Sequence, residues 1–515
     1  MINSTFLLVI TLTDLYLTKS IANNLSNGSI DRLGVIDIGS NSVRLVIFDG
    51  AARSPAYFFN EKVLCALGDN LGPNGDLNDI NKQRALSAIK RFVMLAQSMN
   101  SSLRAIATAA IRNAPNGQDF CSKIRTETGL KVIIVTGEEE ARLSAEGVLL
   151  GWPDSDGIVC DLGGASMELA EISNGIVGAA TSSPLGPLIL DRLFTDPIIK
   201  RNYIKSKLIE LRKLFKKNYK SIYLVGGSWR TIARLQMEIS DYPLKVLHEY
   251  KINISDIKIT TDWIRNSSIE KMSKVYPSST ARLKLLPTSA LILQEIIENF
   301  NPKKIEISSY GIREGLLYGS MDAKLRKLDP LIEACQYMEN SASRIPGFGM
   351  ALFSFILPLY DKDDLKIVRL VQAACLLHDV TWRAHPDYRA EVCFEYATRA
   401  NLGGLDHSER IFLALALLFR YKSSRNKSAF KSVLSILTKN EQILAKTLGK
   451  AMRFGAMLSG SMDGSMGELK ILKNKKVLQI MISKNNKDLF GEVVQLRFSS
   501  LAESLGCEPS LVVQK

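Results

Sequence analysis

Two short segments in different halves of the chain contain the residue types that phosphate chemistry requires. Asp37–Leu45 reads Asp-Ile-Gly-Ser-Asn-Ser-Val-Arg-Leu and Asp161–Leu169 reads Asp-Leu-Gly-Gly-Ala-Ser-Met-Glu-Leu, so Asp, Gly, Ser and Leu recur at the same offsets. Small residues in a turn let backbone N–H groups approach an anion, and a nearby carboxylate can hold a cation. The repeat predicts two similar lobes that face each other across a phosphate-binding cleft.

The turns within these segments supply the expected phosphate contacts. Their backbone amides and hydroxyls can converge on phosphate oxygens. The turn residues are Gly39, Ser40, Asn41 and Ser42 in the first segment and Gly163, Gly164, Ala165 and Ser166 in the second. Asp37 and Asp161 precede the turns, where a carboxylate can bind Mg²⁺ directly or through water. Glu168 adds a third acid. Taken alone, the first turn is also compatible with a hairpin containing an Asx-turn.

A glutamate near the start of a helix is the candidate for activating water. Thr136 and Glu139 have the spacing of a capping box, and acids in a first helical turn are favourable against the helix dipole. Glu140 lies one position deeper, where a carboxylate facing the cleft could orient and deprotonate water for attack on phosphorus. Arg112 follows another strand-like stretch. It could clamp phosphate with two parallel donors, although a single arginine there is usually structural.

Two further motifs carry weaker signals. Val225–Arg230 reads Val-Gly-Gly-Ser-Trp-Arg, a strand end and helix start that suits anion or nucleoside binding as well as close strand–helix packing. Leu376–Val380 reads Leu-Leu-His-Asp-Val, a pattern familiar from metal-dependent HD phosphohydrolases. Such sites need an upstream histidine, and the only one, His248, lies outside this domain. We therefore expect His378 and Asp379 to form a structural pair and not a metal centre.

Alternating strands and helices must position these residues. Strands are expected at 34–38, 43–48, 104–108 and 131–135, with helices at 79–98 and 138–150, and the alternation restarts near residue 156. The predicted fold class is α/β, with a two-lobed core and a mainly helical C-terminal domain. That domain ends in a small α+β part, in which 477–482 and 493–498 read as strands. The expected boundaries are an N-terminal extension at 1–32, lobes at 33–155 and 156–327, and the helical domain at 328–515.

Composition limits the class of protein and its partners. A hydrophobic content of 46% with 23% charged residues is typical of a soluble globular protein. The net charge of +14 favours polyanionic partners, although solvated lysine-rich surface explains individual basic clusters equally well. The seven cysteines form no C-x-x-C pair, which indicates reduced core residues in a cytoplasmic protein. Residues 6–12 are apolar, but they lack a preceding positive charge and the length of a membrane span, so we expect a poorly ordered extension.

With these motifs in hand, residues 33 to about 320 resemble the exopolyphosphatase/guanosine pentaphosphate phosphohydrolase (Ppx/GppA) family. The helical tail with its His-Asp pattern resembles, more loosely, the HD-like extension of the longer members. Supporting segments are Pro184–Gly186, Leu286–Ala290 and Gly311–Leu317. The resemblance implies an actin-like (ASKHA, ribonuclease H-like) double lobe with the substrate in the cleft. It also implies that Glu140 activates water, that Arg112 and the two turns contact phosphate, and that Asp161 and Glu168 associate with the metal.

Two positions depart from the family's usual Gly-Gly-Gly-Ser-Thr-Glu pattern in the second turn. Ala165 replaces a glycine and restricts the backbone slightly, while Met167 replaces the threonine and removes a hydroxyl. We expect altered affinity. Loss of activity does not follow, because Asp161, Ser166 and Glu168 are present.

The resulting hypothesis is a cytoplasmic, Mg²⁺-dependent exopolyphosphatase that removes terminal phosphate from inorganic polyphosphate. The closest alternative keeps this chemistry and takes guanosine pentaphosphate as substrate. An actin-like small-molecule kinase and a non-catalytic polyphosphate or nucleotide sensor are further alternatives. Besides the substrate, the expected partner is a second copy in a homodimer. Neither a membrane nor nucleic acid is expected.

Overall fold

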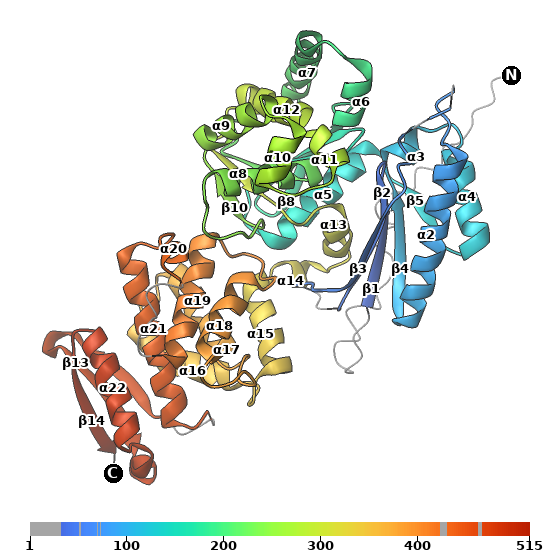
Figure 1. The fold of residues 1–515 in the computed structure, drawn as a ribbon. Helices are drawn as coiled ribbons and strands as arrows, with labels where there is room; N and C mark the ends of the chain where they lie inside the picture. Colours follow the sequence, from blue (N-terminus) through green and yellow to red (C-terminus); the bar gives the residue numbers. More distant parts are fainter. Residues whose placement is uncertain are drawn as a thin grey trace. The chain divides into compact units, whose positions relative to one another are not determined.

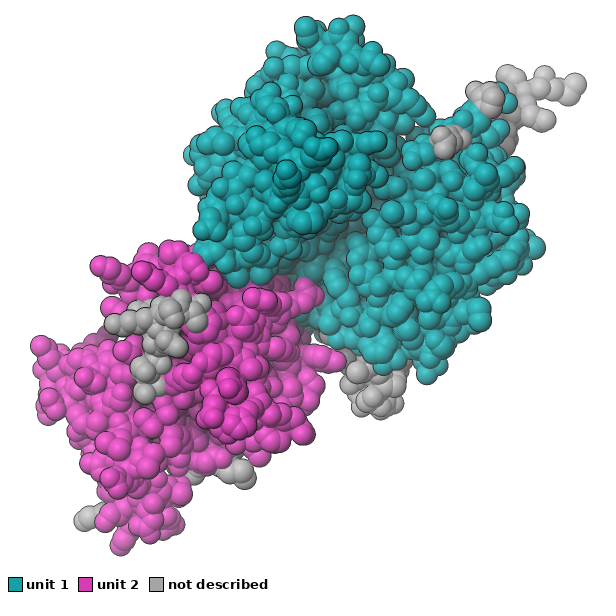
Figure 2. Space-filling model, in the orientation of Figure 1, with its two compact units in different colours: residues 1–328 teal, residues 329–515 magenta. Residues whose placement is uncertain are grey.

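The computed structural model describes residues 32–50, 53–69, 71–72, 74–422, 430–461 and 466–514. The chain divides into two compact units, residues 1–328 and 329–515 (Figure 2). The N-terminal extension expected at 1–32 lies outside the described residues except for Arg32, which begins the first strand.

The first part of unit 1 is a mixed sheet with the strand order β3-β2-β1-β4-β5 (Figure 1). Strand β1 pairs antiparallel with β2 and parallel with β4, and its residues Leu33–Ile36 are buried, as expected for a central strand covered on both faces. Helix α2 begins at Asn78, whose side chain accepts hydrogen bonds from the next turn. The elements are β1 (Arg32–Ile38), β2 (Ser42–Phe48), β3 (Tyr57–Leu64), α2 (Asp79–Ser98), β4 (Ser101–Ala107), α3 (Ala109–Asn113), α4 (Gly117–Thr128), β5 (Val132–Ile134) and α5 (Gly137–Gly151).

The second part of unit 1 repeats this arrangement in a sheet of order β10-β11-β9-β6-β7-β8. Strand β6 pairs antiparallel with β7 and parallel with β9, as β1 does with β2 and β4. The elements are β6 (Gly157–Leu162), β7 (Met167–Ser173), β8 (Ile176–Ser183), α6 (Pro187–Leu193), α7 (Pro197–Arg212), β9 (Ser221–Val225), α8 (Gly227–Ile239), β10 (Tyr250–Ile252), α9 (Ile254–Arg265), α10 (Ile269–Val275), α11 (Thr280–Lys284), α12 (Leu286–Phe300), β11 (Lys304–Ile307), α13 (Ile312–Gly319) and α14 (Ala323–Arg326).

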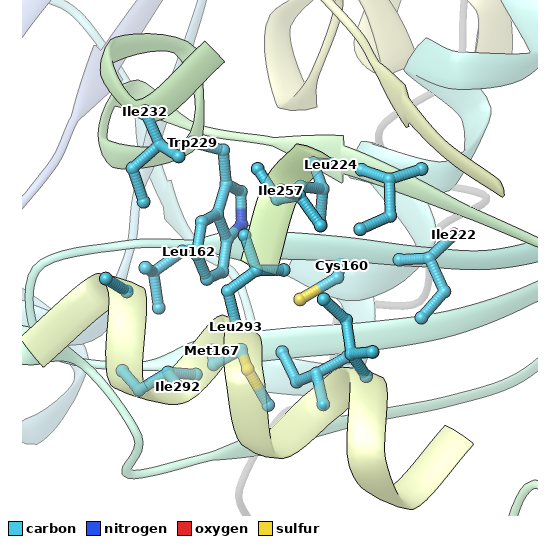
Figure 3. Close-up of a cluster of buried hydrophobic side chains, with 14 of the residues drawn as sticks. Cys160, Leu162, Met167, Ile222, Leu224, Trp229, Ile232, Ile257, Ile292 and Leu293 are labelled. Carbon is cyan, nitrogen blue, oxygen red and sulfur yellow. The ribbon is translucent and has the colours of Figure 1, made fainter. Parts of the chain in front are cut away.

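A large apolar core fills the second lobe between its sheet and the covering helices. Trp229 of α8, Cys160 of β6 and Met167 of β7 are completely or almost completely buried there, together with Ile292 and Leu293 of α12 (Figure 3). Burial of this many large side chains is the main favourable term for the lobe. The core fixes α8 against β6 and β9, and so fixes the loops at the ends of those strands.

Helices α5 and α13 pack against each other and connect the two lobes of unit 1. Helix α5 lies on strands β6, β7 and β8, whereas α13 contacts β1. The two helices approach closely because glycines lie at their contact. A Cβ on Gly315 would lie 1.8 Å from the carbonyl oxygen of Leu143, and one on Gly147 would lie 2.2 Å from that of Gly311. This contact determines where the first turn of α5 is held.

We expect Gly315→Ala to destabilise unit 1 because the added methyl group overlaps the backbone of α5. Overpacking of this kind typically costs about 1–3 kcal/mol. Urea unfolding followed by circular dichroism measures the change in the free energy of unfolding. Gly72→Ala is the matched control, since its Cβ would meet Asp76 at an ordinary 3.6 Å. Equal stability of the two variants would contradict the packing argument.

Unit 2 is mainly helical and ends in a small three-stranded sheet of order β12-β13-β14. Its helices are α15 (Pro330–Ala342), α16 (Phe348–Ile356), η1 (Leu357–Leu359), α17 (Leu365–Leu377), α18 (Arg389–Arg399), α19 (His407–Tyr421), α20 (Lys431–Leu434), α21 (Lys439–Leu458), η2 (Lys473–Lys475), η3 (Lys484–Leu489) and α22 (Glu492–Ser504). Its strands are β12 (Glu468–Leu472), β13 (Val477–Ser483) and β14 (Glu508–Gln514).

The prediction of a strand at 493–498 was wrong, because these residues belong to α22. Their buried side chains, Val494 and Phe498, are four positions apart, with Leu501 three further along, which is helical spacing. The strand expected at 477–482 is confirmed as β13.

Candidate active site

The two turns predicted from the sequence have the same backbone geometry. The N–H of Gly39 donates to the carbonyl of Ser42, and the N–H of Gly163 donates to that of Ser166, each at 3.0 Å. Each turn joins a central strand to its antiparallel neighbour, β1 to β2 and β6 to β7. The sequence repeat is therefore a structural repeat.

Both turns line one cavity of about 610 Å³ in unit 1. All the predicted turn residues contribute to its wall, namely Gly39, Ser40, Asn41, Ser42, Gly163, Gly164, Ala165 and Ser166. The second turn rests on Gly186, where a Cβ would lie 2.2 Å from the carbonyl carbon of Ala165, so no side chain fits there. Three predicted acids, Asp37, Glu140 and Asp161, line the same cavity. The structure thus brings the separate motifs to one place.

Glu140 is held at the start of α5 by the capping box expected from the sequence. Thr136 Oγ1 accepts from the N–H of Glu139 at 3.1 Å, and Glu139 Oε2 accepts from the N–H of Thr136 at 2.7 Å. Burial raises the pKa of Glu140 to about 7, and the negative charge of Asp161 contributes, while the positive charge of Arg112 opposes the rise. A carboxylate with a pKa near 7 is suited to act as a general base at neutral pH.

Arg112 contacts Glu140 and is not among the residues that line the cavity. Its Nη1 donates to Glu140 Oε2 at 2.9 Å and to the carbonyl of Val135 at 2.8 Å. These bonds orient the carboxylate of Glu140 toward its place in the wall. The direct phosphate contact expected of Arg112 stays a prediction.

Removal of the Arg112 charge should move the acid limb of the pH–activity profile upward. The limb reports the fraction of Glu140 that is deprotonated, so activity falls as the pH drops through about 7. Without the guanidinium the charged carboxylate is less stable, and we expect Arg112→Gln to raise the midpoint of kcat/KM by about one pH unit. Arg142→Gln is the control, because Arg142 pairs with the exposed Glu138. An unchanged midpoint in Arg112→Gln would show that Glu140 does not control the limb.

Asp37 and Asp161 are partly buried carboxyls whose negative charges are incompletely compensated. Asp161 Oδ2 accepts a hydrogen bond from Ser144 of α5, and Asp37 lies 4.0 Å from Nη1 of Arg313. Burial raises the pKa of both, and the charge of Asp37 raises that of Asp161 further. Their charged forms therefore favour a cation nearby.

Glu168 is not part of the cavity wall, although it is the strand partner of Asp161. Its residue is 1% exposed, and its Oε1 accepts from Ser182 Oγ at 2.8 Å. Burial and the charges of Glu140 and Asp161 raise its pKa. The metal association implied for Glu168 stays a prediction. From this position Glu168 would act on a metal only indirectly, through its neighbour Asp161.

Five basic side chains in the wall were not among the predicted site residues. They are Arg44, Lys62, Arg230, Arg282 and Arg313. Burial and the surrounding arginines lower the pKa of Lys62 to about 8, and burial with the charges of two arginines lowers that of Arg44 to about 10. A wall in which cations depress one another's pKa is stabilised by an anion that carries several charges.

Two family profiles together match most of the chain. The profile of the Ppx/GppA phosphatase family matches residues 46–324, and that of the exopolyphosphatase C-terminal domain matches residues 362–512. The chain belongs to the Ppx/GppA phosphatase family. The family resemblance drawn from the sequence is thereby confirmed.

Curated relatives of this Ppx/GppA protein carry different names. Retrograde regulation protein 2 of Saccharomyces cerevisiae is 27% identical over 430 residues, covering 75% of this chain and 72% of the relative. Exopolyphosphatase 1 of Mycobacterium leprae is 26% identical, covering 61% and 95%. The guanosine-5'-triphosphate,3'-diphosphate pyrophosphatase of Photobacterium profundum is 26% identical, covering 86% and 90%.

Solved structures of the family share the fold. A Ppx/GppA family member from Aquifex aeolicus aligns with a TM-score of 0.50 at 26% identity, and an exopolyphosphatase from Cytophaga hutchinsonii with a TM-score of 0.52 at 23% identity. Each alignment covers 56% of this chain and 97% of the solved chain. The actin-like double lobe followed by a helical domain, expected from the sequence, is confirmed.

Of the two residues that depart from the Ppx/GppA turn pattern, one lies in the cavity wall and the other in the apolar core. Ala165 lines the cavity, and its φ is not in the left-handed region, so the methyl group causes no backbone strain there. Met167 is 0% exposed and packs in the core of the second lobe (Figure 3). Its side chain does not line the cavity, so the loss of a hydroxyl at 167 changes the core and not the wall.

The His-Asp motif of unit 2 is held by structural partners. His378 Nδ1 donates to the carbonyl of Cys375 at 2.8 Å, and Asp379 receives two bonds from the guanidinium of Arg344 at 2.6 and 2.8 Å. The two residues thus bind separate partners. In the described ranges, no group of three or more His, Cys, Asp or Glu side chains is gathered as a metal site. Nor does any helix there have the length and apolar character to cross a membrane.

Proposed function

We propose that the chain hydrolyses the terminal phosphate of inorganic polyphosphate. The observation that carries the proposal is that Glu140, the two turns and five cationic side chains line one cavity. Cations and turn amides bind the phosphate oxygens, and Glu140 lies in the same wall as a base of suitable pKa. In the reaction, Glu140 takes a proton from water, the water oxygen bonds to the terminal phosphorus, and the bridging P–O bond breaks. The products are orthophosphate and a chain one phosphate shorter.

Mg²⁺ fits the acidic part of the wall as the cofactor. Mg²⁺ is usually held by one or two carboxylates together with water and substrate phosphates, so a cage of three protein acids is not required. Asp37 and Asp161 have this character, because both are partly buried carboxyls with raised pKa values that line the cavity. When bound, the ion would neutralise charge on the transferred phosphate.

The lining of the cavity favours an inorganic chain over a guanine nucleotide. None of the described residues in the wall is aromatic, so no ring is placed there to stack on a purine. The five basic residues of the wall suit consecutive phosphates. Guanosine pentaphosphate remains the second candidate, because relatives of this chain are named for a guanosine substrate.

A comparison of the two substrates tests the proposal. Phosphate release from long-chain polyphosphate and from guanosine pentaphosphate would be measured by malachite green, with Mg²⁺ and with EDTA. We expect a higher kcat/KM for polyphosphate and loss of release in EDTA. Faster release from guanosine pentaphosphate would select the alternative. Tight polyphosphate binding without release from either substrate would favour a sensor.

The location and assembly of the chain belong to the same proposal. All seven cysteines are free thiols, and six of them are buried, which supports a reducing compartment such as the cytoplasm. A homodimer stays a prediction, and light scattering of the purified chain checks it.

A further inference from the structure

Three charged residues form a row across the strands that carry the first turn. Asp37 of β1 pairs with Arg44 of β2, and Arg44 pairs with Lys62 of β3. Residues that lie directly opposite each other in antiparallel strands point to the same face of the sheet. All three residues line the cavity of unit 1. The row therefore starts at an acid of the site and crosses the sheet along the cavity wall.

This row leads from the half-buried part of the cavity wall to solvent. Asp37 and Arg44 are half-buried, whereas Lys62 is exposed on β3, the edge strand of the sheet. On its other side Asp37 pairs with Ile106 of β4, which is buried and apolar. Two strand spacings, about 10 Å, separate the backbones of Asp37 and Lys62. Pyrophosphate is too short to span this separation, whereas a longer phosphate chain can follow it.

The corresponding row of the second lobe has the opposite character. Asp161 of β6 pairs with Glu168 of β7, and Glu168 pairs with Ser182 of β8. This row contains two carboxyl groups and no cation, so it offers a polyanion no attractive charge beyond the first acid. Although the two lobes repeat one arrangement of strands, only the row through Arg44 and Lys62 gives a phosphate chain a favourable direction.

The two cations of the row differ in how they are held. Arg44 Nε donates to Oδ1 of Asn60 at 2.8 Å, and Asn60 also lines the cavity. Asn60 and Lys62 are two positions apart on β3, so their side chains share a face of the strand. Among the residues that the structure describes, Lys62 has neither a hydrogen-bond partner nor an ion-pair partner. Its ammonium group is therefore available to an anion in the cavity.

We propose that Lys62 binds a phosphate unit behind the terminal one and so makes the affinity depend on chain length. The terminal phosphate lies with Glu140 and the two turns, and the rest of the chain leaves the cavity past Arg44 and Lys62 toward the edge of the first sheet. Because Lys62 is exposed, a long chain continues from it into solvent. The inference rests on the proposed function, since it orients polyphosphate in the same cavity.

The affinity for phosphate chains of increasing length tests this direction. Calorimetry on the full chain with Glu140→Gln, in which turnover is slowed, would measure Kd for pyrophosphate, tripolyphosphate and long-chain polyphosphate. Adding Lys62→Met should reduce the ratio of long-chain to pyrophosphate affinity about 5- to 10-fold, the order expected for one charge-assisted contact at an exposed position. Arg91→Met in the same background is the matched control. Arg91 pairs at 2.8 Å with Glu61, the neighbour of Lys62 on β3, and does not line the cavity.

The outcomes separate this inference from the proposed function. A ratio that Lys62→Met leaves unchanged, including an equal loss of affinity for pyrophosphate and the long chain, would overturn the inference. A ratio reduced by Arg91→Met as much as by Lys62→Met would overturn it too, because the effect would then be one of net charge. The proposed function fails on a different result, the absence of phosphate release from the unmodified chain with polyphosphate and Mg²⁺. Binding to the Glu140→Gln protein does not require that reaction.

Discussion

Glu140→Gln is expected to reduce kcat for phosphate release from polyphosphate about 10²- to 10⁴-fold, the usual contribution of a general base. Glutamine keeps the shape of the side chain and can still contact Arg112 through its carbonyl oxygen, but it cannot take a proton from water. The cationic wall and the two turns are unchanged, so KM and the affinity for polyphosphate should change little. Steady-state kinetics and direct binding measurements on the same variant separate these two effects.

Glu138→Gln is the matched control for this prediction. Glu138 lies in the same first turn of α5, but its side chain is 59% exposed and pairs with Arg142 at 3.3 Å. It carries the same change of charge without access to the cavity. We expect nearly normal kcat for this variant. Undiminished turnover in Glu140→Gln would show that Glu140 is not the general base. The cavity would then have only a binding role.

The parts of the site that the sequence predicted are those fixed by local rules. The turns at Gly39–Ser42 and Gly163–Ser166 are closed by hydrogen bonds between residues three apart, and the capping box at Thr136 spans four residues. Helix 79–98 was predicted correctly because its cap and its apolar spacing lie within one segment. Turns and helix caps depend on residues that are close together in the chain, so a single sequence is enough to predict them.

The parts that the sequence did not predict depend on distant segments or on side-chain direction. Lys62 on edge strand β3 and Arg282 on the short helix α11 reach the cavity only because the two lobes face each other. No local spacing distinguishes them from solvated basic residues. Arg44 lay within the repeated segment itself, opposite Asp37 in the strand register, and this position was the available signal. Glu168 and Met167 are buried and do not line the cavity, a result of packing that the motif alone does not specify.

The positions of the acids in the cavity wall indicate which of them can act on the substrate directly. Three carboxylates lie in the wall, and each has a raised pKa for the same main reason, its burial. The guanidinium of Arg112 contacts the carboxylate of Glu140, and Glu140 lies in the first turn of α5. This position suits proton transfer. Asp161 accepts a hydrogen bond from Ser144 of α5 and has no cationic partner within ion-pair distance in the described ranges. We therefore propose a division of labour, with Glu140 as the base and Asp161 as the residue that would hold the metal.

Asp161→Asn is therefore expected to abolish most of the response to Mg²⁺ and to lower kcat about 10²- to 10³-fold, because the metal's stabilisation of transition-state charge is worth several kcal/mol. Asparagine fits the same space and can keep the bond to Ser144, so the turn should remain intact. Titration of phosphate release with Mg²⁺ measures the effect, and we expect the variant to need at least about tenfold more Mg²⁺ for half-maximal activity. Asp156→Asn is the control, since Asp156 is exposed beside the start of the same strand and its Oδ2 accepts a hydrogen bond from Ser173 Oγ at 3.0 Å. An Asp161→Asn variant with the Mg²⁺ response of the unmodified chain would place the metal elsewhere, and Asp37 would then be the carboxylate to replace next.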